Sequence, residues 1–108
     1  MNDIWVEVTP NDNCMWQLKG NTYAEKPTLE MLQATVGGYI EFVPDSYLAE
    51  DVIHIIVNEE GLLRELPVNN LASQQLSMTA NNPIFGNAIL HVDEKFITKK
   101  YWLSEGEE

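Results

Sequence analysis

Residues 28–41 read TLEMLQATVGGYIE, a stretch that predicts a helix ending at two glycines and leading straight into a strand. Thr28 follows a proline and is a suitable N-cap. The apolar positions of the stretch recur at helical spacing: Leu29, Leu32 and Val36. Gly37 can adopt the left-handed conformation that ends a helix without a Cβ clash. We therefore expect one main helix over residues 28–36.

Strand signals flank this helix on both sides. Runs of β-branched and aromatic residues between turn residues predict strands over residues 4–8, 39–43, 52–57, 62–66 and 84–92. Residues 15–19 are expected to pair back on the first of these as a hairpin. The run 52–57 is almost continuously apolar, which predicts the middle strand of the sheet, covered on both faces. Residues 58–61 end in glycine and predict a hairpin turn into 62–66.

Two weaker signals complete the outline. Residues 71–76 are expected to form a short second helix capped by Asn69 or Asn70, and residues 95–103 an edge strand or a short helix. The predicted class is α+β, a small and mostly antiparallel sheet of about five to six strands with one main helix, because hairpin connections are too short for parallel crossovers. We expect a single domain over residues 1–103 and a disordered acidic tail over 104–108.

The helix-to-strand stretch, together with three later blocks, resembles a domain family of unknown function from phages, plasmids and large viruses. The later blocks are VNEEG at 57–61, LPVNNLA at 66–72, and Gly86 in the last predicted strand. The likeness covers roughly residues 28–92, and the chain departs from it at Leu62, where relatives usually carry a basic or small residue. The resemblance implies a viral or mobile-element origin and supplies no catalytic residues.

The chain is strongly acidic. It has 17 Asp and Glu against 6 Lys and Arg, a formal net charge of −11 at pH 7. Such a charge repels phosphate backbones and anionic membranes, so we expect neither direct nucleic-acid binding nor membrane binding. A basic protein would be attracted instead, although solubility alone also accounts for a charge of this kind.

Cysteine usage and hydropathy predict a cytoplasmic protein. Cys14 is the one cysteine of the chain, so no intramolecular disulfide is expected, and the Cys and His spacing does not resemble a zinc site. Residues 1–20 lack a basic n-region and a long apolar run, and no apolar stretch reaches the length of a bilayer span. For a protein of viral origin, the expected compartment is the host cytoplasm.

Motifs for catalysis are lacking. The sequence has no phosphate-binding glycine loop with lysine, no GxSxG elbow and no HExxH zinc motif. His54 and His91 each lie in an apolar strand run, which predicts core or sheet-surface histidines. Glu41 and the Glu50-Asp51 and Glu59-Glu60 pairs lack the spacing of a Ca²⁺ loop. We therefore expect no catalytic residue, no metal and no cofactor.

Candidate binding residues lie near strand ends and turns. Amide and phenol groups there can build a small pocket, although asparagines at such positions more often serve as caps or turn residues. Trp102, beside the charged tail, is expected to be an exposed anchor for a partner or for a second copy of the chain. The candidates for binding a ligand or partner are Tyr39, Glu41, Asn58, Glu59, Glu60, Asn69, Asn70 and Trp102.

Three function classes remain on these grounds. The first is a non-enzymatic phage or mobile-element accessory protein that binds a host or viral protein. A basic protein that normally holds nucleic acid is one candidate partner, which would make this chain an anti-defence protein or DNA mimic. The alternative is a protein that binds or sequesters a small molecule of the nucleotide type. An enzyme that uses carboxylate chemistry is the third.

Overall fold

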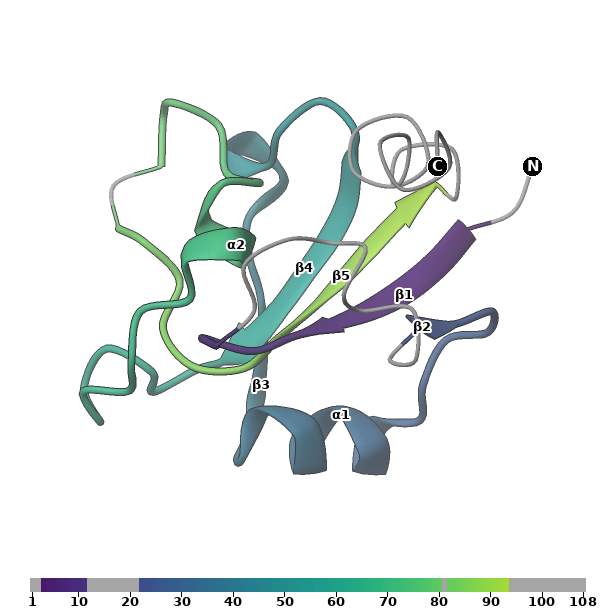
Figure 1. The fold of residues 1–108 in the computed structure, drawn as a ribbon, viewed down its shortest axis with the longest axis horizontal. Coiled ribbons are helices and arrows are strands. Elements are labelled where there is room, and N and C mark those ends of the chain that lie inside the picture. The colour runs from purple at the N-terminus through teal and green to yellow at the C-terminus, as the bar shows by residue number, and fades with distance from the viewer. Residues whose placement is uncertain (1–2, 12–21, 81, 94–108) are drawn as a thin grey trace, which may run out of the picture.

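One antiparallel sheet organises the structure, a computed structural model that describes residues 3–11, 22–80 and 82–93 (Figure 1). Its strands are β1 (Asp3–Val8), β2 (Thr22–Tyr23), β3 (Ile40–Phe42), β4 (Val52–Asn58) and β5 (Ala88–Asp93), in the order β2-β1-β5-β4-β3. The helices are α1 (Leu29–Val36), the 3-10 turn η2 (Asp45–Tyr47) and α2 (Asn70–Ser73). The α+β class is confirmed. Four strands of the sheet have three or more residues, and β2 has only two. The expected number of about five to six strands is therefore slightly too high.

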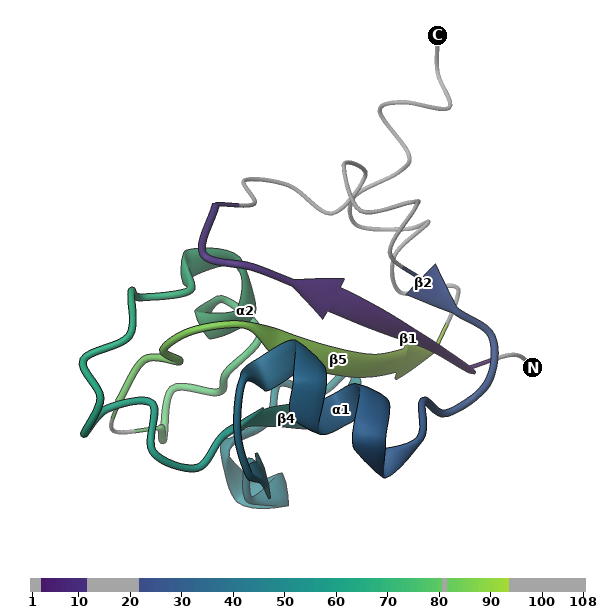
Figure 2. The same ribbon diagram turned by 90° about the horizontal axis from the view of Figure 1, so that it is seen from below.

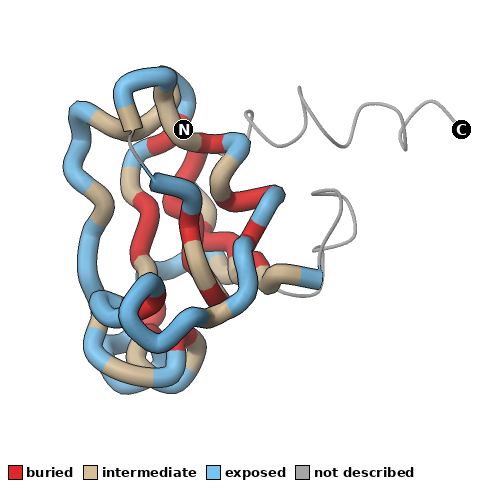
Figure 3. The backbone as a smooth tube through the Cα atoms, turned by 90° about the vertical axis from the view of Figure 1, so that its left-hand side faces the viewer, coloured by how far each residue is buried: buried red, intermediate tan, exposed pale blue. Residues whose placement is uncertain are grey.

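The sheet separates two hydrophobic cores. Because side chains alternate along a strand, β5 sends Ala88, Leu90 and Val92 to one face and Ile89 to the other. The larger core joins the first set to Val6, Val8, Ile55, Leu71 and Ala72. The smaller core joins Ile89 to Trp5, Leu32 and Ile56. Helix α1 crosses the second face in front of β4 and β5 (Figure 2), and buried residues follow the strands through the interior (Figure 3).

Helix α1 forms where the sequence predicted it. Thr28 is the N-cap, and its Oγ1 accepts a hydrogen bond from the Met31 N–H at 3.2 Å. Gly37 ends the helix with φ of 81° and donates its N–H to the Gln33 carbonyl. Leu32 and Val36 are buried, whereas Leu29 is 58% exposed. Neither this helix nor any other in the described ranges is long and apolar enough to cross a membrane.

Strand β4 is an interior strand, but it is not the middle one as predicted. The middle position belongs to β5, which pairs with β1 on one side and β4 on the other. The register of β4 shifts between Val52 and His54, and Ile53 within this irregularity is 37% exposed. The continuous apolar run therefore predicted correctly that β4 has a neighbour on each side. Its position in the sheet depends on the pairing of β1 with β5, which the run does not indicate.

The strand predicted over residues 62–66 is wrong. This segment is a series of turns in which Arg64 donates its N–H to the Glu60 carbonyl and Leu66 to the Gly61 carbonyl. Both edges of β4 are already used by β3 and β5, so no edge is left for a hairpin partner. Leu62 and Leu63 are accordingly 58% and 83% exposed.

The last strand starts later than predicted. Residues 84–87 precede β5, which begins at Ala88, because Gly86 adopts φ of 81° and turns the chain there. The predictions for residues 15–19, for 95–103, for the tail 104–108 and for Trp102 lie outside the described residues.

Helix α2 is shorter than the predicted 71–76, and Asn69 rather than Asn70 is its N-cap. The Asn69 side chain is fully buried: its Oδ1 accepts from the Ala72 N–H, and its Nδ2 donates to the carbonyls of Val8 and Gly86. One amide group thus ties the end of β1, the Gly86 turn and the start of α2 together, and satisfies backbone groups that water cannot reach.

We predict that Asn69→Ala lowers the free energy of unfolding by more than about 2 kcal/mol, because it removes a cap and leaves buried carbonyls unpaired. Urea denaturation measures the change. Asn70→Ala is the matched control, since Asn70 is exposed and has no side-chain bond of this kind. Equal losses in the two variants would contradict the role assigned to Asn69.

Candidate functional site

A pocket of about 380 Å³ lies where β3 and β4 meet the loops that cover the larger core. Its volume falls in the range typical of ligand pockets. The sheet, η2 and the segments 61–62 and 76–85 each contribute to it. The lining residues are Glu41, Val43, Pro44, Tyr47, Val57, Asn58, Glu59, Gly61, Leu62, Leu76, Ala80, Asn82, Pro83, Ile84 and Phe85.

Two carboxylates lie at the sheet side of this pocket because of the β3–β4 register. Glu41 is paired with Val57, and the Glu59 N–H donates to the Tyr39 carbonyl at 3.1 Å, so Glu59 lies opposite Tyr39. Residues two apart on a strand point to the same face. Glu41 and Glu59 are therefore diagonal neighbours on one face, where like charges repel each other. Both residues are exposed.

The remaining walls of the pocket are largely apolar. Val57, Leu76 and Ile84 belong to the larger core or pack against it. The Ser77 N–H donates to the Tyr47 carbonyl at 2.7 Å, which fixes η2 against the segment that follows α2. Gly61 allows close approach of the opposite wall, since a Cβ there would come within 3.1 Å of the Phe85 carbonyl oxygen. The pocket thus combines a charged sheet side with hydrophobic walls.

Asn58 has a structural role at the edge of the pocket. Its Nδ2 donates to the Val36 carbonyl at 3.0 Å, and its Oδ1 accepts from the Glu60 N–H at 2.7 Å. A Cβ on Gly38 would come within 3.0 Å of that Nδ2, so the second glycine of the pair gives room for the amide. Arg64 Nη1 donates to the Gly37 carbonyl at 3.1 Å. These contacts join the end of α1 to the end of β4.

The structure distributes the predicted binding residues over several places. Glu41, Asn58 and Glu59 line the pocket, whereas Tyr39, 70% exposed, and Glu60 lie outside its lining. Asn69 is the buried cap described above, and Asn70 is exposed at the start of α2. Sequence reasoning did not propose the loop residues of the lining, among them Tyr47, Asn82 and Phe85. Turn signals mark the segments of Tyr47 and Asn82, and Phe85 falls in the strand predicted over residues 84–92. Neither kind of signal reveals which side of a pocket a residue lines.

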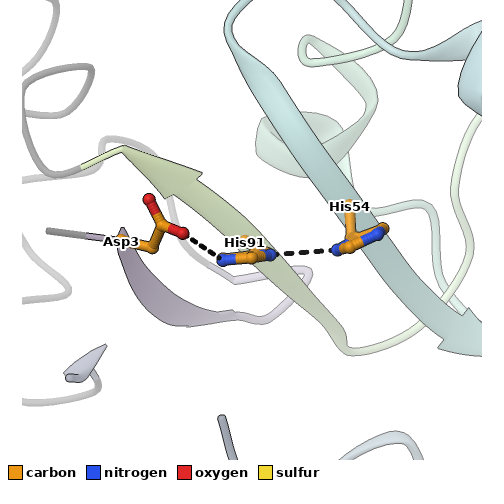
Figure 4. A network of polar contacts seen from close by, with 3 residues as sticks. All are labelled: Asp3, His54 and His91. Carbon is orange, nitrogen blue, oxygen red and sulfur yellow. Dashed lines mark hydrogen bonds and ion pairs between the residues drawn. The ribbon is translucent and has the colours of Figure 1, made fainter. Parts of the chain in front are cut away.

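A second polar feature is a histidine row across three strands (Figure 4), on the same sheet face as Ile56 and Ile89 of the smaller core. We use this name for Asp3 of β1, His91 of β5 and His54 of β4. His91 Nε2 lies 3.3 Å from Asp3 Oδ2, and the two histidine Nδ1 atoms lie 2.9 Å apart. The Trp5 ring stacks on His91 with centroids 3.8 Å apart and planes at 6°. In the described ranges, no group of three or more His, Cys, Asp or Glu side chains is arranged to hold a metal ion.

The surroundings of His91 disfavour its charged form. Burial lowers the pKa of His91 from its ordinary value of 6.5, and His54 lowers it further, while the Asp3 carboxylate acts in the opposite direction. His91 is 9% exposed and His54 is partly buried. The prediction of core or sheet-surface histidines agrees with these positions. The sequence did not predict that the two rings meet, because 37 residues separate them along the chain.

Comparison with known proteins gives a family without an assigned activity. The family model for a domain of unknown function, DUF3846, matches residues 10–99. No curated protein and no solved structure matches the chain. The matched range includes the pocket and both histidines, so these features lie within the family domain. The chain belongs to the DUF3846 family of domains of unknown function.

Proposed function

We propose that this domain is a non-enzymatic accessory protein of a phage or another mobile element, and that it acts in the host cytoplasm by binding a basic host or viral protein. The observation that carries the proposal is the pocket at the β3–β4 end, where Glu41 and Glu59 share one sheet face beside apolar walls. A lysine or arginine side chain of the partner has the matching chemistry, because it combines a long aliphatic stem with a cationic head.

The repulsion between the two carboxylates supports a cationic occupant. Glu41 and Glu59 have no ion pair with any residue of the described part of the chain. A bound guanidinium or ammonium group would relieve their repulsion and donate hydrogen bonds to both. The stem of that side chain would lie along residues such as Val57, Leu62 and Phe85.

The overall charge supports a basic partner at longer range. Lys26 and Arg64 are the only cationic side chains within the described ranges, and Arg64 already caps α1. A net charge of −11 accelerates encounter with a positively charged surface, an effect that salt weakens. A protein that normally holds nucleic acid presents such a surface, and a DNA mimic would compete for it.

The chemistry of the lining favours binding over catalysis. Among the described residues of the chain, those that line the pocket include no Ser, Cys, His or Lys, the side chains that most often serve as nucleophiles or bases. The nucleotide alternative is supported by the pocket volume but opposed by its charge. Within the described part of the chain, the lining offers a phosphate no Lys or Arg, and it presents two carboxylates that repel one.

We predict that the domain binds an arginine-containing peptide and that Glu41→Gln/Glu59→Gln weakens binding at least about tenfold, since the loss of two charged contacts corresponds to about 1.4 kcal/mol or more. Fluorescence anisotropy with a labelled Ser/Ala peptide carrying one arginine at its centre measures the affinity. The same peptide with citrulline, an uncharged isostere, should bind much more weakly.

A charge-matched variant separates the pocket from general attraction. Glu25→Gln/Glu50→Gln removes the same charge at two exposed positions outside the lining, so it should leave the affinity nearly unchanged. Equal losses in both double variants would overturn the assignment of the pocket. Failure of the wild type to distinguish arginine from citrulline would overturn the proposal of a basic partner. Stabilisation by a nucleotide in a thermal-shift assay would favour the small-molecule alternative.

We also predict that Glu41→Gln/Glu59→Gln stabilises the free domain by roughly 0.2 to 1 kcal/mol at low salt, because it removes like charges on one sheet face. Chemical denaturation at low and high salt measures the difference, which should shrink as salt screens the repulsion. Glu25→Gln/Glu50→Gln serves again as the charge-matched control. A pocket variant no more stable than this control would mean that the two carboxylates do not repel each other appreciably.

A further inference from the structure

The two histidine rings of the row meet edge to edge. Their centroids are 5.2 Å apart, their planes differ by 19°, and the two Nδ1 atoms are only 2.9 Å apart. The nitrogen atoms therefore lie between the ring centres, so the lone pair of one nitrogen faces the other ring's nitrogen in the ring plane. This is the geometry of an N–H···N hydrogen bond rather than of face-to-face stacking.

The positions of the protons follow from Asp3. An ionised carboxylate only accepts hydrogen bonds, so His91 Nε2, facing Asp3 Oδ2, must carry a hydrogen. A neutral imidazole has one N–H, which leaves His91 Nδ1 as an acceptor. His54 Nδ1 must then be the donor of the hydrogen bond between the rings, and His54 Nε2 is left with a free lone pair.

The row can take up one proton without rearrangement but not two. A proton on His54 Nε2, which lies outside the contact between the rings, would leave their hydrogen bond intact. A second would have to add to His91 Nδ1, where it would face the His54 Nδ1 hydrogen across 2.9 Å. Two donors and two positive charges would then oppose each other, and the hydrogen bond would break.

Charged groups approach the row from several elements. Asp3 of β1 favours a charged His91, whereas His54 of β4 and Lys26, which follows β2, disfavour it. Asp93 lies two residues after His91 on β5, and it is the cross-strand partner of Asp3. Strand β3 contributes the uncharged Phe42, whose ring meets His54 edge-on at 5.5 Å. On the side of α1, Glu7 accepts a hydrogen bond from Thr35 at 3.1 Å.

The row lies next to an irregularity in the β4–β5 pairing. The register shifts between Val52 and His54, so regular backbone pairing is interrupted immediately before His54. The bond between His54 and His91 spans the two strands at this point and supplements the backbone ladder.

We propose that Asp3, His91 and His54 form a proton-sensing latch that holds the start of β4 to β5 and β1 while the two rings share one hydrogen bond, and that protonation of His91 opens it. Opening would free the segment around Ile53, which is already 37% exposed, and would leave the rest of the sheet paired. The latch gives the domain a conformational response to mild acidification.

The direction of the pH effect follows from the lowered pKa of His91. The unfolded chain binds this proton more readily than the folded one, so stability is complete above the ordinary pKa of 6.5 and falls as the pH decreases from there toward the lowered folded value. Acid therefore weakens the folded state through His91.

The tautomers provide a direct test on the wild-type protein. His54 and His91 are the two histidines of the chain, so its long-range ¹H–¹⁵N spectrum contains two imidazole patterns. At about pH 7.5, above the ordinary histidine pKa, we expect the Nδ1–H tautomer for His54 and the Nε2–H tautomer for His91. Finding both rings in the Nε2–H tautomer would overturn the proposal, since their Nδ1 atoms could not then be hydrogen-bonded.

A stability measurement tests the latch itself. Urea unfolding at about pH 7.5 and about pH 5.5, values on either side of the ordinary histidine pKa, should show that His91→Gln loses less stability on acidification than the wild type. The chain's 17 acidic residues titrate in both proteins, so the difference isolates His91. Asp3→Asn should retain a fall on acidification, because burial and His54 still disfavour a charged His91. Identical losses in wild type and His91→Gln would overturn the latch.

Discussion

The requirement to cover both faces of β5 organises this domain. Residues Ala88 to Val92 are all buried although successive side chains point in opposite directions, so apolar material must lie on each side of the sheet. Helix α1 provides it on one face through Leu32. The other face is covered by α2 and by loop segments that contribute Val43, Leu48 and Ile84. Each layer is attached by a buried asparagine, Asn58 beside α1 and Asn69 at α2.

The candidate sites lie where this cover is incomplete. On the α1 face, Ile56 and Ile89 form a cross-strand pair within the smaller core, and the pair His54 and His91 lies farther along the same strands. The two imidazole rings at this position satisfy each other through the hydrogen bond between their Nδ1 atoms. On the opposite face, loops rather than a long helix meet the end of β3 and β4. Surface loops often form binding sites, and the pocket beside Glu41 and Glu59 is lined by these loops and the sheet.

The sequence blocks that suggested a family are used mainly to build the backbone. Gly37 and Gly86 adopt positive φ, Gly61 lies against the Phe85 carbonyl, and Asn58 and Asn69 bond buried main-chain groups. Such residues define a fold without defining a reaction, because the same scaffold can present different side chains at its surface. The proposed binding residues Glu41 and Glu59 lie beside these structural positions, and their carboxylates remain available to solvent.

By itself, the sequence determined what depends on neighbouring residues: the Thr28 cap, the helix end at Gly37, the strands around β1, β3 and β4, and the acidity of the surface. Tertiary structure alone decided what depends on competition between distant segments. Residues 62–66 are apolar enough for a strand, yet both edges of β4 are taken by β3 and β5. The contacts among Asp3, His54 and His91, and the enclosure of the pocket by residues 76–85, likewise depend on strand order. Which strands pair depends on burial over the whole sheet, and a local sequence pattern does not determine it.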